Sequence, residues 1–452
     1  MEVSCPIFEQ ASQNPHHLAL ITDERTWTYA QLDGAIHSLT RFLKKTGIKE
    51  KDHIPFIAKS HLSTILLLFA LFRMGAVACP LSFRIPQEKL PQLFKDLRAA
   101  HIFEPETLPL QSEPSSPSTI CLYTPATLLL TSGSSGFPKI ASHTYANHYY
   151  NALGATAAYH LESSSRWLLS LPLFHVSGIG ILFRCFLQGA AAILSELPVL
   201  EAIGKHQITH LSQVPTQLYR LLKEPDLSFT SSLQCLVLGG APLPKDLIQR
   251  AHAKDLPILT TYGMTEMSST ITLSEKKACD YAGKILPYRE LKIEKDQEIW
   301  VRGKTRFEGY WNPAVQSVDK LTEEQWFPTQ DLGKLTESGE LEIIGRKDRQ
   351  FISGGENIQP EEIEKALCNV PGIVQASVLP VDDPEFGKRP VAFIHDETAS
   401  HTLQTIRKAL SETIPSFMYP IAILNYPNEL ELKPSSALLK AHLKEWSLKN
   451  QG

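Results

Sequence analysis

The sequence lacks closely spaced cysteine pairs and any apolar run long enough to cross a bilayer. Its seven cysteines are scattered, without a C-x-x-C motif, at Cys5, Cys79, Cys121, Cys185, Cys235, Cys279 and Cys368. An odd and dispersed set argues against a disulfide framework and against a zinc site. The most hydrophobic segment, 65–72, ends at Arg73, whereas a membrane-spanning helix needs about 20 apolar residues. We therefore expect a reducing, cytoplasmic compartment and no stable membrane insertion.

The sequence also has no excess of basic residues, and its first residues do not follow the pattern of a secretory signal. Lys plus Arg number 44 and Asp plus Glu 48, which gives a net charge of −4. Without a basic field, we expect no nucleic-acid partner. The segment 1–15 has neither the basic start nor the apolar core of a secretory signal. A small anionic ligand would therefore depend on local basic residues.

Both common nucleotide-binding patterns are absent. Lys139 follows a proline and precedes Ile140, which excludes G-x-x-x-x-G-K-[ST], and no G-x-G-x-x-G occurs. The segment 131–139 instead reads TSGSSGFPK, directly after the apolar stretch 126–130. Glycines let backbone N–H groups converge on an oxyanion, while hydroxyls and the lysine add donors and charge. This pattern predicts a phosphate-binding loop, with a flexible Gly/Ser surface loop as the alternative.

Length and composition indicate a globular α/β protein of two or three domains. The chain has 452 residues, 43% of them hydrophobic, against roughly 150 residues per domain. Short apolar strands alternate with helix-forming segments, which is typical of an α/β sheet with parallel strands. Two expected strands, 235–238 and 258–261, each run into glycine, at Gly239-Gly240 and at Gly263. Such turns at the carboxyl edge of a sheet are a usual nucleotide site.

The composition changes beyond Trp326. Charged residues cluster at 345–349, and a Gly-Gly loop follows them. After that loop, the pattern predicts a helix at 360–367 and two strands near 373–380 and 390–395. We interpret the chain as a large domain over 1–345, a hinge over 346–348 and a small α+β domain over 349–452.

The order of the short motifs is more specific than any one of them. TSGSSGFPK at 131 is followed by PLFHVSG, LGGAPLP, TYGMTE, RFEGYW, QDLG and GRKDRQFISGGENIQPEEIE. This series resembles the acyl-adenylate-forming superfamily over essentially the whole chain. Within the superfamily, segments 170–190 and 211–222 look most like the 2-succinylbenzoate–CoA ligases of menaquinone biosynthesis. The resemblance implies an α/β fold with mixed sheets flanked by helices, and a small mobile α+β C-terminal domain.

The resemblance implies a two-step ligation that uses ATP, Mg²⁺ and coenzyme A. A carboxylate attacks the α-phosphate of ATP and displaces pyrophosphate, and the thiol of coenzyme A then attacks the acyl-adenylate. Both reactants in the first step are anions, so the site must neutralise charge and hold the attacking oxygen in line. The expected partners are thus a small carboxylic acid, ATP and coenzyme A.

The resemblance also implies the nucleotide site. The expected set is Thr131, Ser132, Gly133, Ser134, Ser135, Gly136, Lys139, Gly240, Ala241, Tyr262, Gly263, Met264, Thr265, Asp331 and Arg346. Within it, Tyr262 would stack on adenine, Asp331 would accept the ribose hydroxyls, and Arg346 would reach the ribose from the linker. Glu266 would hold Mg²⁺, a hard cation suited to carboxylate and phosphate oxygen. The residues expected to take part in catalysis are Lys139, His175, Thr265 and Glu266.

The expected acid pocket includes His175, Arg184, Gly239, Ser269 and Thr270. Arg184 stands in the apolar run 179–187, where an unpaired guanidinium would be costly, so it should meet an anion or reach solvent. At helical spacing it shares a face with Gly180 and points at a dicarboxylic substrate or at an internal carboxylate. The resemblance favours the substrate.

For the second step, the resemblance implies a coenzyme A tunnel and a pivot. Ser353, Gly354 and Gly355 would line the tunnel, where missing side chains let a thin thiol arm pass. An ordinary hairpin loop is the alternative. Asp348 would be the hinge, since a few backbone angles at a short linker can carry a domain rotation.

The C-terminus departs from the family pattern G-K-x-x-R-x-x-L. When Lys440 and Leu443 are aligned with its arginine and leucine, Ala437 stands where the lysine should be. Loss of a transition-state cation would slow adenylation about a hundredfold or more. Three explanations stay open: Lys433 or Lys440 substitutes, the chain was deliberately altered, or adenylation is slow. Smaller departures are Ile140 and Gln330, where the family usually has glycine.

Two alternatives to a 2-succinylbenzoate–CoA ligase remain at this stage. One is a CoA ligase for another aryl or medium-chain acid. The other is an adenylate-binding protein with weakened turnover, motivated by Ala437. The sequence does not fix the oligomeric state, and a dimer is compatible with it.

Overall fold

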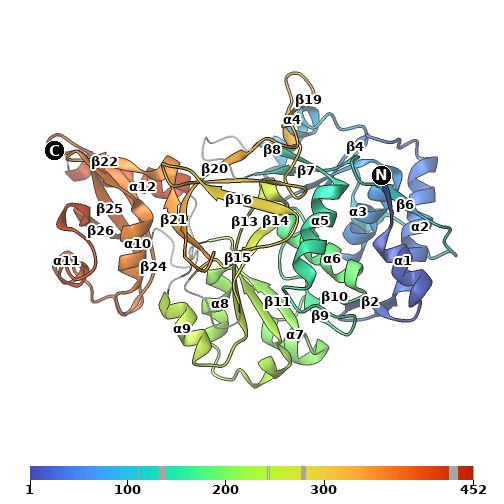
Figure 1. Ribbon diagram of the computed structural model, residues 1–452, viewed down its shortest axis with the longest axis horizontal. Coiled ribbons are helices and arrows are strands. Elements are labelled where there is room, and N and C mark those ends of the chain that lie inside the picture. Colours follow the sequence, from blue (N-terminus) through green and yellow to red (C-terminus); the bar gives the residue numbers. More distant parts are fainter. Residues whose placement is uncertain are drawn as a thin grey trace.

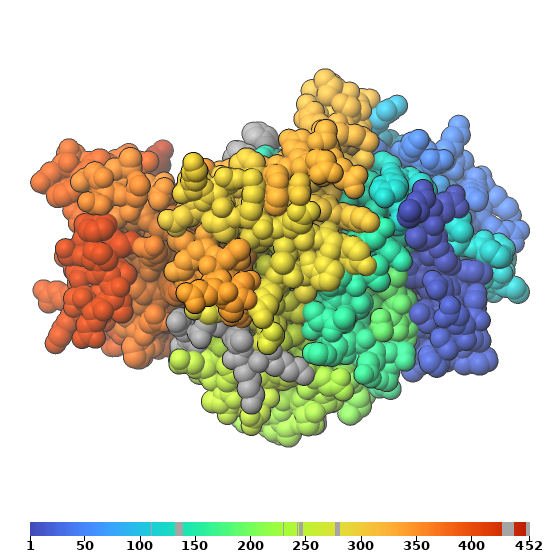
Figure 2. All heavy atoms as spheres, in the orientation of Figure 1, coloured from blue at the N-terminus to red at the C-terminus, as the bar shows by residue number. Residues whose placement is uncertain are grey.

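The computed structural model describes residues 1–109, 111–131, 139–241, 243, 245–275, 281–426 and 436–450. A large body is built around two mixed sheets, and the C-terminal segment forms a smaller lobe at one end of the molecule (Figure 1, Figure 2). This arrangement confirms the expected α/β class with mixed sheets flanked by helices. Within the described ranges, no helix combines the length and apolar character that crossing a membrane requires.

The larger sheet has nine strands in the order β15-β14-β13-β12-β11-β9-β10-β2-β3. Neighbours from β13 to β2 run parallel, and antiparallel strands close both edges. The strands are β2 (Leu18–Thr22), β3 (Thr26–Thr28), β9 (Arg166–Leu168), β10 (Ala191–Leu194), β11 (His210–Gln213), β12 (Cys235–Leu238), β13 (Ile258–Met264), β14 (Ser269–Leu273) and β15 (Lys284–Ile285). The parallel strands are buried on both faces, as their continuous apolar runs predict.

The second mixed sheet has six strands in the order β19-β18-β8-β7-β5-β4. They are β4 (His53–Ile57), β5 (Val77–Leu81), β7 (Pro125–Leu130), β8 (Ile140–Thr144), β18 (Gly309–Asn312) and β19 (Ser317–Lys320). Strands β7 and β8 are antiparallel neighbours. The expected phosphate-binding segment therefore connects two adjacent strands.

Helices cover both sheets. The helices of the large body are α1 (Pro6–Gln13), α2 (Tyr29–Lys45), α3 (Leu62–Met74), α4 (Leu90–Asp96), α5 (Tyr145–Thr156), α6 (Val176–Gln188), α7 (Val199–His206), α8 (Pro215–Leu222) and α9 (Lys245–His252). From Leu62 to Phe72, every residue of α3 is buried, because a helix that is apolar all round must be enclosed. The apolar segment is therefore a core helix, as its short length predicted.

A third sheet of four antiparallel strands leads towards the C-terminal lobe. Its strands are β16 (Arg289–Ile293), β17 (Glu298–Gly303), β20 (Phe327–Leu335) and β21 (Leu341–Arg346), and β1 (Glu2–Ser4) pairs separately with β6 (Thr119–Cys121). Figure 1 shows β21 between the large body and the lobe. The residues after β21 are thus the connection between the two parts.

The C-terminal lobe has its own hydrophobic core, which runs from Phe351 to Met418. Its elements are β22 (Phe351–Ser353), β23 (Glu356–Ile358), α10 (Pro360–Cys368), β24 (Ile373–Asp383), β25 (Gly387–Asp396), α11 (Leu403–Leu410), β26 (Ala422–Asn425) and α12 (Ser436–Asn450). The helix and both strands expected from the sequence are present, and the strands extend further than their apolar runs. The lobe contacts the large body where Glu397 pairs with Lys223 at 2.9 Å and accepts a hydrogen bond from Tyr219.

Candidate active site

Two neighbouring parallel strands, β12 and β13, bring the expected nucleotide residues to one edge of the nine-stranded sheet. After β12, a Cβ atom at Gly239 would lie 2.6 Å from Cγ2 of Thr261, so only glycine fits there. Gly240 has φ +76°, a left-handed conformation that favours glycine, and half-buried Ala241 follows it. The first expected glycine turn is therefore present, with little side-chain volume above the strand end.

The second expected turn is wrong in its detail, because β13 does not stop at residue 261. It continues to Met264 and pairs with the antiparallel strand β14 through a bulge at Tyr262 and Gly263. A Cβ atom at Gly263 would lie 2.1 Å from the carbonyl oxygen of Ser269. Gly263 thus has a packing role, and Met264 packs in a small cluster beside Tyr262.

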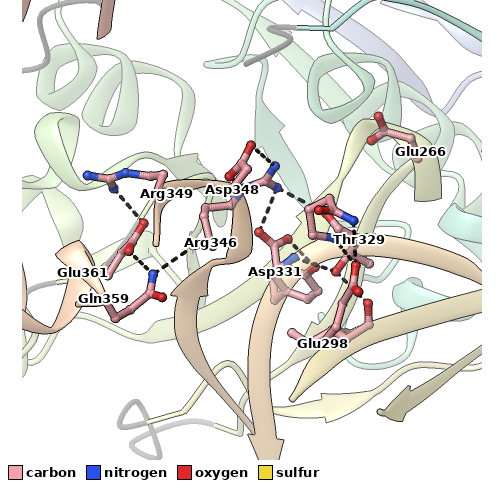
Figure 3. Close-up of polar contacts among 12 residues, drawn as sticks. Glu266, Glu298, Thr329, Asp331, Arg346, Asp348, Arg349, Gln359 and Glu361 are labelled. Carbon is pink, nitrogen blue, oxygen red and sulfur yellow. Dashed lines mark hydrogen bonds and ion pairs between the residues drawn. The ribbon is translucent and has the colours of Figure 1, made fainter. Parts of the chain in front are cut away.

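Tyr262, Asp331 and Arg346 lie together, and Figure 3 shows Asp331 beside Arg346. The Tyr262 hydroxyl donates to Oδ2 of Asp331 at 2.6 Å, and Nη1 of Arg346 donates to Oδ1 at 2.9 Å. Burial raises the pKa of Asp331, although both partners oppose that shift. Asp331 reaches this position from β20, and Arg346 ends β21, which pairs with it. Three residues expected at one nucleoside are thus brought into direct contact.

Gln330, which replaces the glycine usual in the family, holds a left-handed conformation with φ +64°. Its backbone N–H and side-chain amide both donate to Oε1 of buried Glu298, at 3.0 and 2.9 Å. A non-glycine residue in this region costs roughly 1–3 kcal/mol, and these charge-assisted hydrogen bonds offset that strain. The turn before Asp331 is therefore fixed without glycine.

Thr265 and Glu266 form a short turn after β13 that neighbouring strands hold in place. Nε2 of His143, on β8, bonds the Thr265 carbonyl at 2.7 Å. The N–H of Phe307 donates to the Glu266 carbonyl at 2.8 Å, and the hydroxyl of Tyr310 donates to Oε1 of Glu266 at 2.6 Å. Burial lowers the pKa of His143 to about 4, so the ring is neutral near pH 7. The carboxylate of Glu266 is thus held in one orientation.

The base of the expected phosphate loop is closed by its two ends. The N–H of Thr131 donates to the carbonyl of Lys139 at 2.8 Å. The Lys139 ammonium lies 4.8 Å from the centre of the Tyr310 ring, within the range of a cation–π contact. Ser132, Gly133, Ser134, Ser135 and Gly136, expected to bind phosphate, lie outside the described residues. Lys139, at the C-terminal end of this segment, and Glu266 therefore both contact Tyr310.

Arg184 lies on α6, 3% exposed, and is enclosed by neutral groups. Its Nη2 donates to Oδ1 of Asn151 and to Oγ1 of Thr270, both at 3.2 Å. Its guanidinium carbon lies 5.1 Å from the ring centre of Tyr159 and 5.6 Å from that of Trp167. No carboxylate of the described chain pairs with it, so the internal-acid alternative has no support within those ranges.

A second buried arginine, Arg289, lies beside the first. It is 5% exposed and donates to the backbone carbonyls of Thr270, Asn151 and Pro287. Burial lowers the pKa of Arg289 to about 9, and the charge of Arg184 contributes to that shift. None of the described acidic residues forms an ion pair with Arg289 either. Two guanidinium groups thus share one buried region that is short of negative charge.

The remaining pocket residues lie on the same elements. His175 caps the N-terminus of α6, is exposed and lies with its ring centre 4.6 Å from that of Phe174. It is therefore not an enclosed core histidine. Partial burial and the charge of Arg84 lower its pKa. Gly180 borders the Arg184 guanidinium as expected, with a virtual Cβ atom 3.3 Å from Nη2, and half-buried Ser269 starts β14.

The linker between the two parts is anchored on both sides, and Figure 3 shows the anchor of Arg349 on Glu361. Lys347 pairs with Asp296 at 2.7 Å and with Glu298 at 2.8 Å, both in the large body. Arg349 pairs with Glu361 at 2.7 Å and Glu364 at 2.6 Å, both in the C-terminal lobe. Asp348 lies between these two anchors. Its carboxylate accepts two hydrogen bonds from Arg346, at 3.1 and 3.2 Å.

The residues expected to line the coenzyme A tunnel form the turn between β22 and β23. Ser353 is buried, and Gly354 and Gly355 have φ +58° and +89°. A Cβ atom at Gly354 would touch the Phe386 ring, whereas one at Gly355 would meet nothing within 4 Å. The hairpin geometry is thus present, and there is free space beside the Cα atom of Gly355.

The C-terminal helix α12 begins at Ser436, so Ala437 occupies its first turn. Lys440 is exposed on this helix and borders a groove against Leu379 and Val381 of β24. Lys433 lies outside the described residues. Lys440 is thus a surface residue of the lobe in this arrangement.

Comparison with known proteins identifies the family. The model of the AMP-binding enzymes matches residues 7–126 and 104–311, and that of the AMP-binding enzyme C-terminal domain matches 362–436. The chain belongs to the AMP-binding enzymes. The 2-succinylbenzoate–CoA ligase of Escherichia coli K12 is 33% identical to this AMP-binding enzyme, and the match covers 96% of each chain.

Solved structures agree with the family assignment. Wild-type E. coli MenE with a bound m-phenylether-linked analogue of OSB-AMS superposes with a TM-score of 0.83. It is 32% identical to this AMP-binding enzyme, and the match covers 98% of this chain and 99% of that one. The o-succinylbenzoate coenzyme A synthetase of Bacillus subtilis, in complex with ATP and magnesium ion, is 26% identical with a TM-score of 0.83, over 94% and 96% of the chains.

The sequence does not predict three residues that lie against the expected site of this AMP-binding enzyme: Tyr310, Arg289 and Glu298. Tyr310 lies in RFEGYW, a motif whose place in the series carries no information about its contacts. Arg289 follows Pro287-Tyr288 in an ordinary mixed segment, and its burial depends on α5 and β14. A basic residue at the start of a strand carries no signal of burial, so only the tertiary arrangement reveals it.

Proposed function

We propose that this protein is an AMP-forming acid–CoA ligase that converts 2-succinylbenzoate to 2-succinylbenzoyl-CoA, through an acyl-adenylate, in menaquinone biosynthesis. The family assignment supports the reaction type, and relatives that share about a third of its residues bear that name. The observation that supports this substrate is a pair of buried arginines, Arg184 and Arg289. Neither has a carboxylate partner within the described residues.

A buried cation without an anion is costly, because desolvation of a guanidinium is not repaid by neutral partners alone. A substrate with two carboxylates resolves this imbalance. One carboxylate reacts, and the other enters the region of Arg184, where Thr270 supplies a hydroxyl and Ser269 and Gly239 border the pocket. Along α6, Arg184 lies about 14 Å from His175, at about 1.5 Å per residue. His175 therefore suits the reacting end of the acid and Arg184 its distant end.

For the nucleotide, Tyr262 offers its ring to adenine, and Gly240 and Ala241 leave room for the base. Asp331 accepts the ribose hydroxyls, with Arg346 beside it. The present hydrogen bonds of Asp331 with Tyr262 and Arg346 support this role, because they keep an acceptor fixed at the nucleoside edge. Gly263 and Met264 shape the wall behind Tyr262.

The phosphates lie, in this proposal, on the segment 131–136 and on Lys139, with Thr265 at the α-phosphate. The carboxylate oxygen of the acid forms a bond to the α-phosphorus, and the bond to the leaving pyrophosphate breaks. Lys139 offsets the charge that develops on the phosphoryl oxygens. In the second step, the sulfur of coenzyme A bonds to the acyl carbon, its proton is lost, and AMP leaves.

Glu266 suits Mg²⁺, which neutralises phosphate charge when bound. The described residues contain no group of three or more His, Cys, Asp or Glu side chains that would hold a metal alone. A single fixed carboxylate fits a cation that takes most of its other ligands from phosphates and water. Oε1 of Glu266 is held by Tyr310, and Oε2 has no hydrogen bond within the described chain.

We also propose that residues 1–345 and 349–452 are separate domains that rotate about Asp348. The anchors of Lys347 and Arg349 support this pivot, because one residue lies between them. After rotation, Ser353, Gly354 and Gly355 would line the coenzyme A tunnel, with Gly355 leaving space for the pantetheine arm. The six described cysteines are free, which supports a reducing, cytoplasmic compartment.

Two measurements test the proposal. Pyrophosphate release is followed with 2-succinylbenzoate and with a panel of aryl and medium-chain acids, and CoA-dependent AMP release is then followed with the best substrate. Highest turnover with 2-succinylbenzoate supports the proposal, and preference for another acid reassigns the substrate. Tight ATP binding without turnover on any acid favours the second candidate, an adenylate-binding protein, which Ala437 motivates.

A further inference from the structure

Tyr310 connects the two charged groups expected at the triphosphate. It lies on β18 and pairs with Ala141 of β8. Its hydroxyl donates to Oε1 of Glu266 at 2.6 Å. The ammonium of Lys139 lies 4.8 Å from its ring centre. One side chain thus touches both the carboxylate expected to bind the cation and the lysine expected to bind phosphate.

The surroundings keep this tyrosine in place. The Phe307 ring packs edge-on against it with centres 4.9 Å apart, and Phe307 also bonds the Glu266 carbonyl through its N–H. A protonated hydroxyl and an ionised carboxylate make a strong, charge-assisted hydrogen bond.

We propose that Tyr310 is a positioning residue for the nucleotide-bound divalent cation: its hydroxyl fixes Oε1 of Glu266 so that Oε2 is presented as a metal ligand. This inference rests on the proposed function only in that it takes Glu266 as the cation ligand. It assigns Tyr310 no contact with substrate. Partners that orient a metal-binding carboxylate typically change metal affinity by about 10- to 100-fold when removed.

The two contacts of Tyr310 can be separated by substitution. Tyr310→Phe keeps the ring beneath Lys139 and removes only the hydroxyl, whereas Tyr310→Leu removes both. Tyr123→Phe is the matched control, because Tyr123 is 56% exposed in the turn between β6 and β7. Circular dichroism establishes that each variant is folded before binding is measured.

The experiment is calorimetric titration of the full chain with ATP, once in EDTA and once in excess Mg²⁺. The ratio of the two dissociation constants gives the gain in affinity that the cation brings. We expect Tyr310→Phe to reduce this gain about 10-fold and to leave the affinity in EDTA unchanged. Tyr310→Leu should weaken ATP binding in EDTA as well, and Tyr123→Phe should match the wild-type chain.

A double-mutant cycle with Glu266→Gln makes the test specific. Glu266→Gln should abolish most of the gain from Mg²⁺, and adding Tyr310→Phe should then have no further effect. The inference is overturned if Tyr310→Phe keeps the wild-type gain, or if it weakens binding equally with and without Mg²⁺. It is also overturned if Glu266→Gln leaves the gain intact or if the two effects add.

These outcomes are independent of the acid substrate. If no acid supports turnover but the titrations follow the expected pattern, the proposed function fails and the role of Tyr310 stands. If 2-succinylbenzoate is converted but Tyr310→Phe behaves as the wild-type chain, the role of Tyr310 fails and the function stands.

Discussion

Replacing Arg184 by methionine should impair substrate use far more than folding. The side chain is 3% exposed, and its hydrogen bonds are to the neutral partners Asn151 and Thr270. In the substrate-free protein, loss of two such bonds costs about 1–3 kcal/mol, and removal of an unpaired buried charge offsets that loss. We therefore expect the thermal midpoint of Arg184→Met to stay near the wild-type value or to rise.

The effect on the reaction differs, because in the complex with substrate Arg184 is expected to have a carboxylate partner. If the second carboxylate of the acid pairs with Arg184, truncating one partner of that buried pair costs about 2–5 kcal/mol. At about 1.4 kcal/mol per tenfold, kcat/KM for 2-succinylbenzoate should fall about 30- to 4,000-fold. Pyrophosphate release measures this fall. A monocarboxylic aryl acid should lose much less, because it has no group to place at Arg184.

Arg289→Met is the matched comparison. Arg289 donates to the carbonyls of Thr270, Asn151 and Pro287, so its loss leaves buried acceptors unpaired and should destabilise the fold by about 2–4 kcal/mol. Calorimetric unfolding of both variants gives the contrast. A destabilised Arg184→Met with wild-type kcat/KM would refute the reasoning, since Arg184 would then have a structural role only.

Three further outcomes are expected. Gly355→Ala and Gly339→Ala both place alanine at a positive φ with nothing within 4 Å of the new Cβ atom, so each should lower the free energy of unfolding by about 1 kcal/mol. Only Gly355→Ala should raise KM for coenzyme A, and equal KM values for the two variants would show that Gly355 does not line the tunnel. Hydrogen bonds to Asp23 from side chains and backbone outweigh partial burial and lower its pKa to about 2. The stabilisation is complete above the unfolded pKa near 3.8 and is lost as pH falls towards 2. Asp23→Asn should therefore flatten the dependence of the unfolding free energy on pH in that window by about 1 kcal/mol after solvent screening, and an unchanged slope would contradict this. Glu397→Gln removes the charge that Lys223 meets across the two parts, so small-angle scattering should show a more expanded average shape at low salt, and an identical scattering profile would show that this pair does not hold the lobe.

The sequence predicts those helices and strands that their own apolar pattern and bounding residues define. The apolar helix at 61–74, the strand at 235–238 and the helix at 360–367 all appear close to their expected bounds. Each has a continuous apolar run or a regular periodicity, followed by glycine or preceded by proline, so local preference and tertiary packing agree.

The strand after residue 258 shows the limit of this reasoning. The sequence predicts a turn at Gly263, but the structure has a bulge there, where Ser269 of the neighbouring strand approaches too closely for a Cβ atom. A turn and a close backbone approach both require glycine, and a single sequence does not distinguish them. The antiparallel partner that decides between them, β14, begins only at Ser269.

For the site residues, the sequence predicts the identity of several residues but not the contacts between them. Asp331, Arg346 and Tyr262 follow from the order of the motifs. The hydrogen bond between Asp331 and Arg346 depends on pairing between β20 and β21, and the one between Asp331 and Tyr262 depends on the approach of β13. The sequence shows that Gln330 departs from glycine, but it does not predict the compensation by Glu298, because the two residues lie on different strands. Long-range polar pairs of this kind leave no periodic trace in the sequence.

The two ion-pair anchors that flank Asp348 restrict the path of any reorientation. If the lobe turns about Asp348 as we propose, Lys347 stays with one body and Arg349 with the other, and the two backbone torsions of a single residue absorb the turn. Two torsions leave few paths for such a motion, so we expect the lobe to keep to a narrow range of orientations. A small angular change at this joint would become a displacement of many ångströms at the far rim of the lobe.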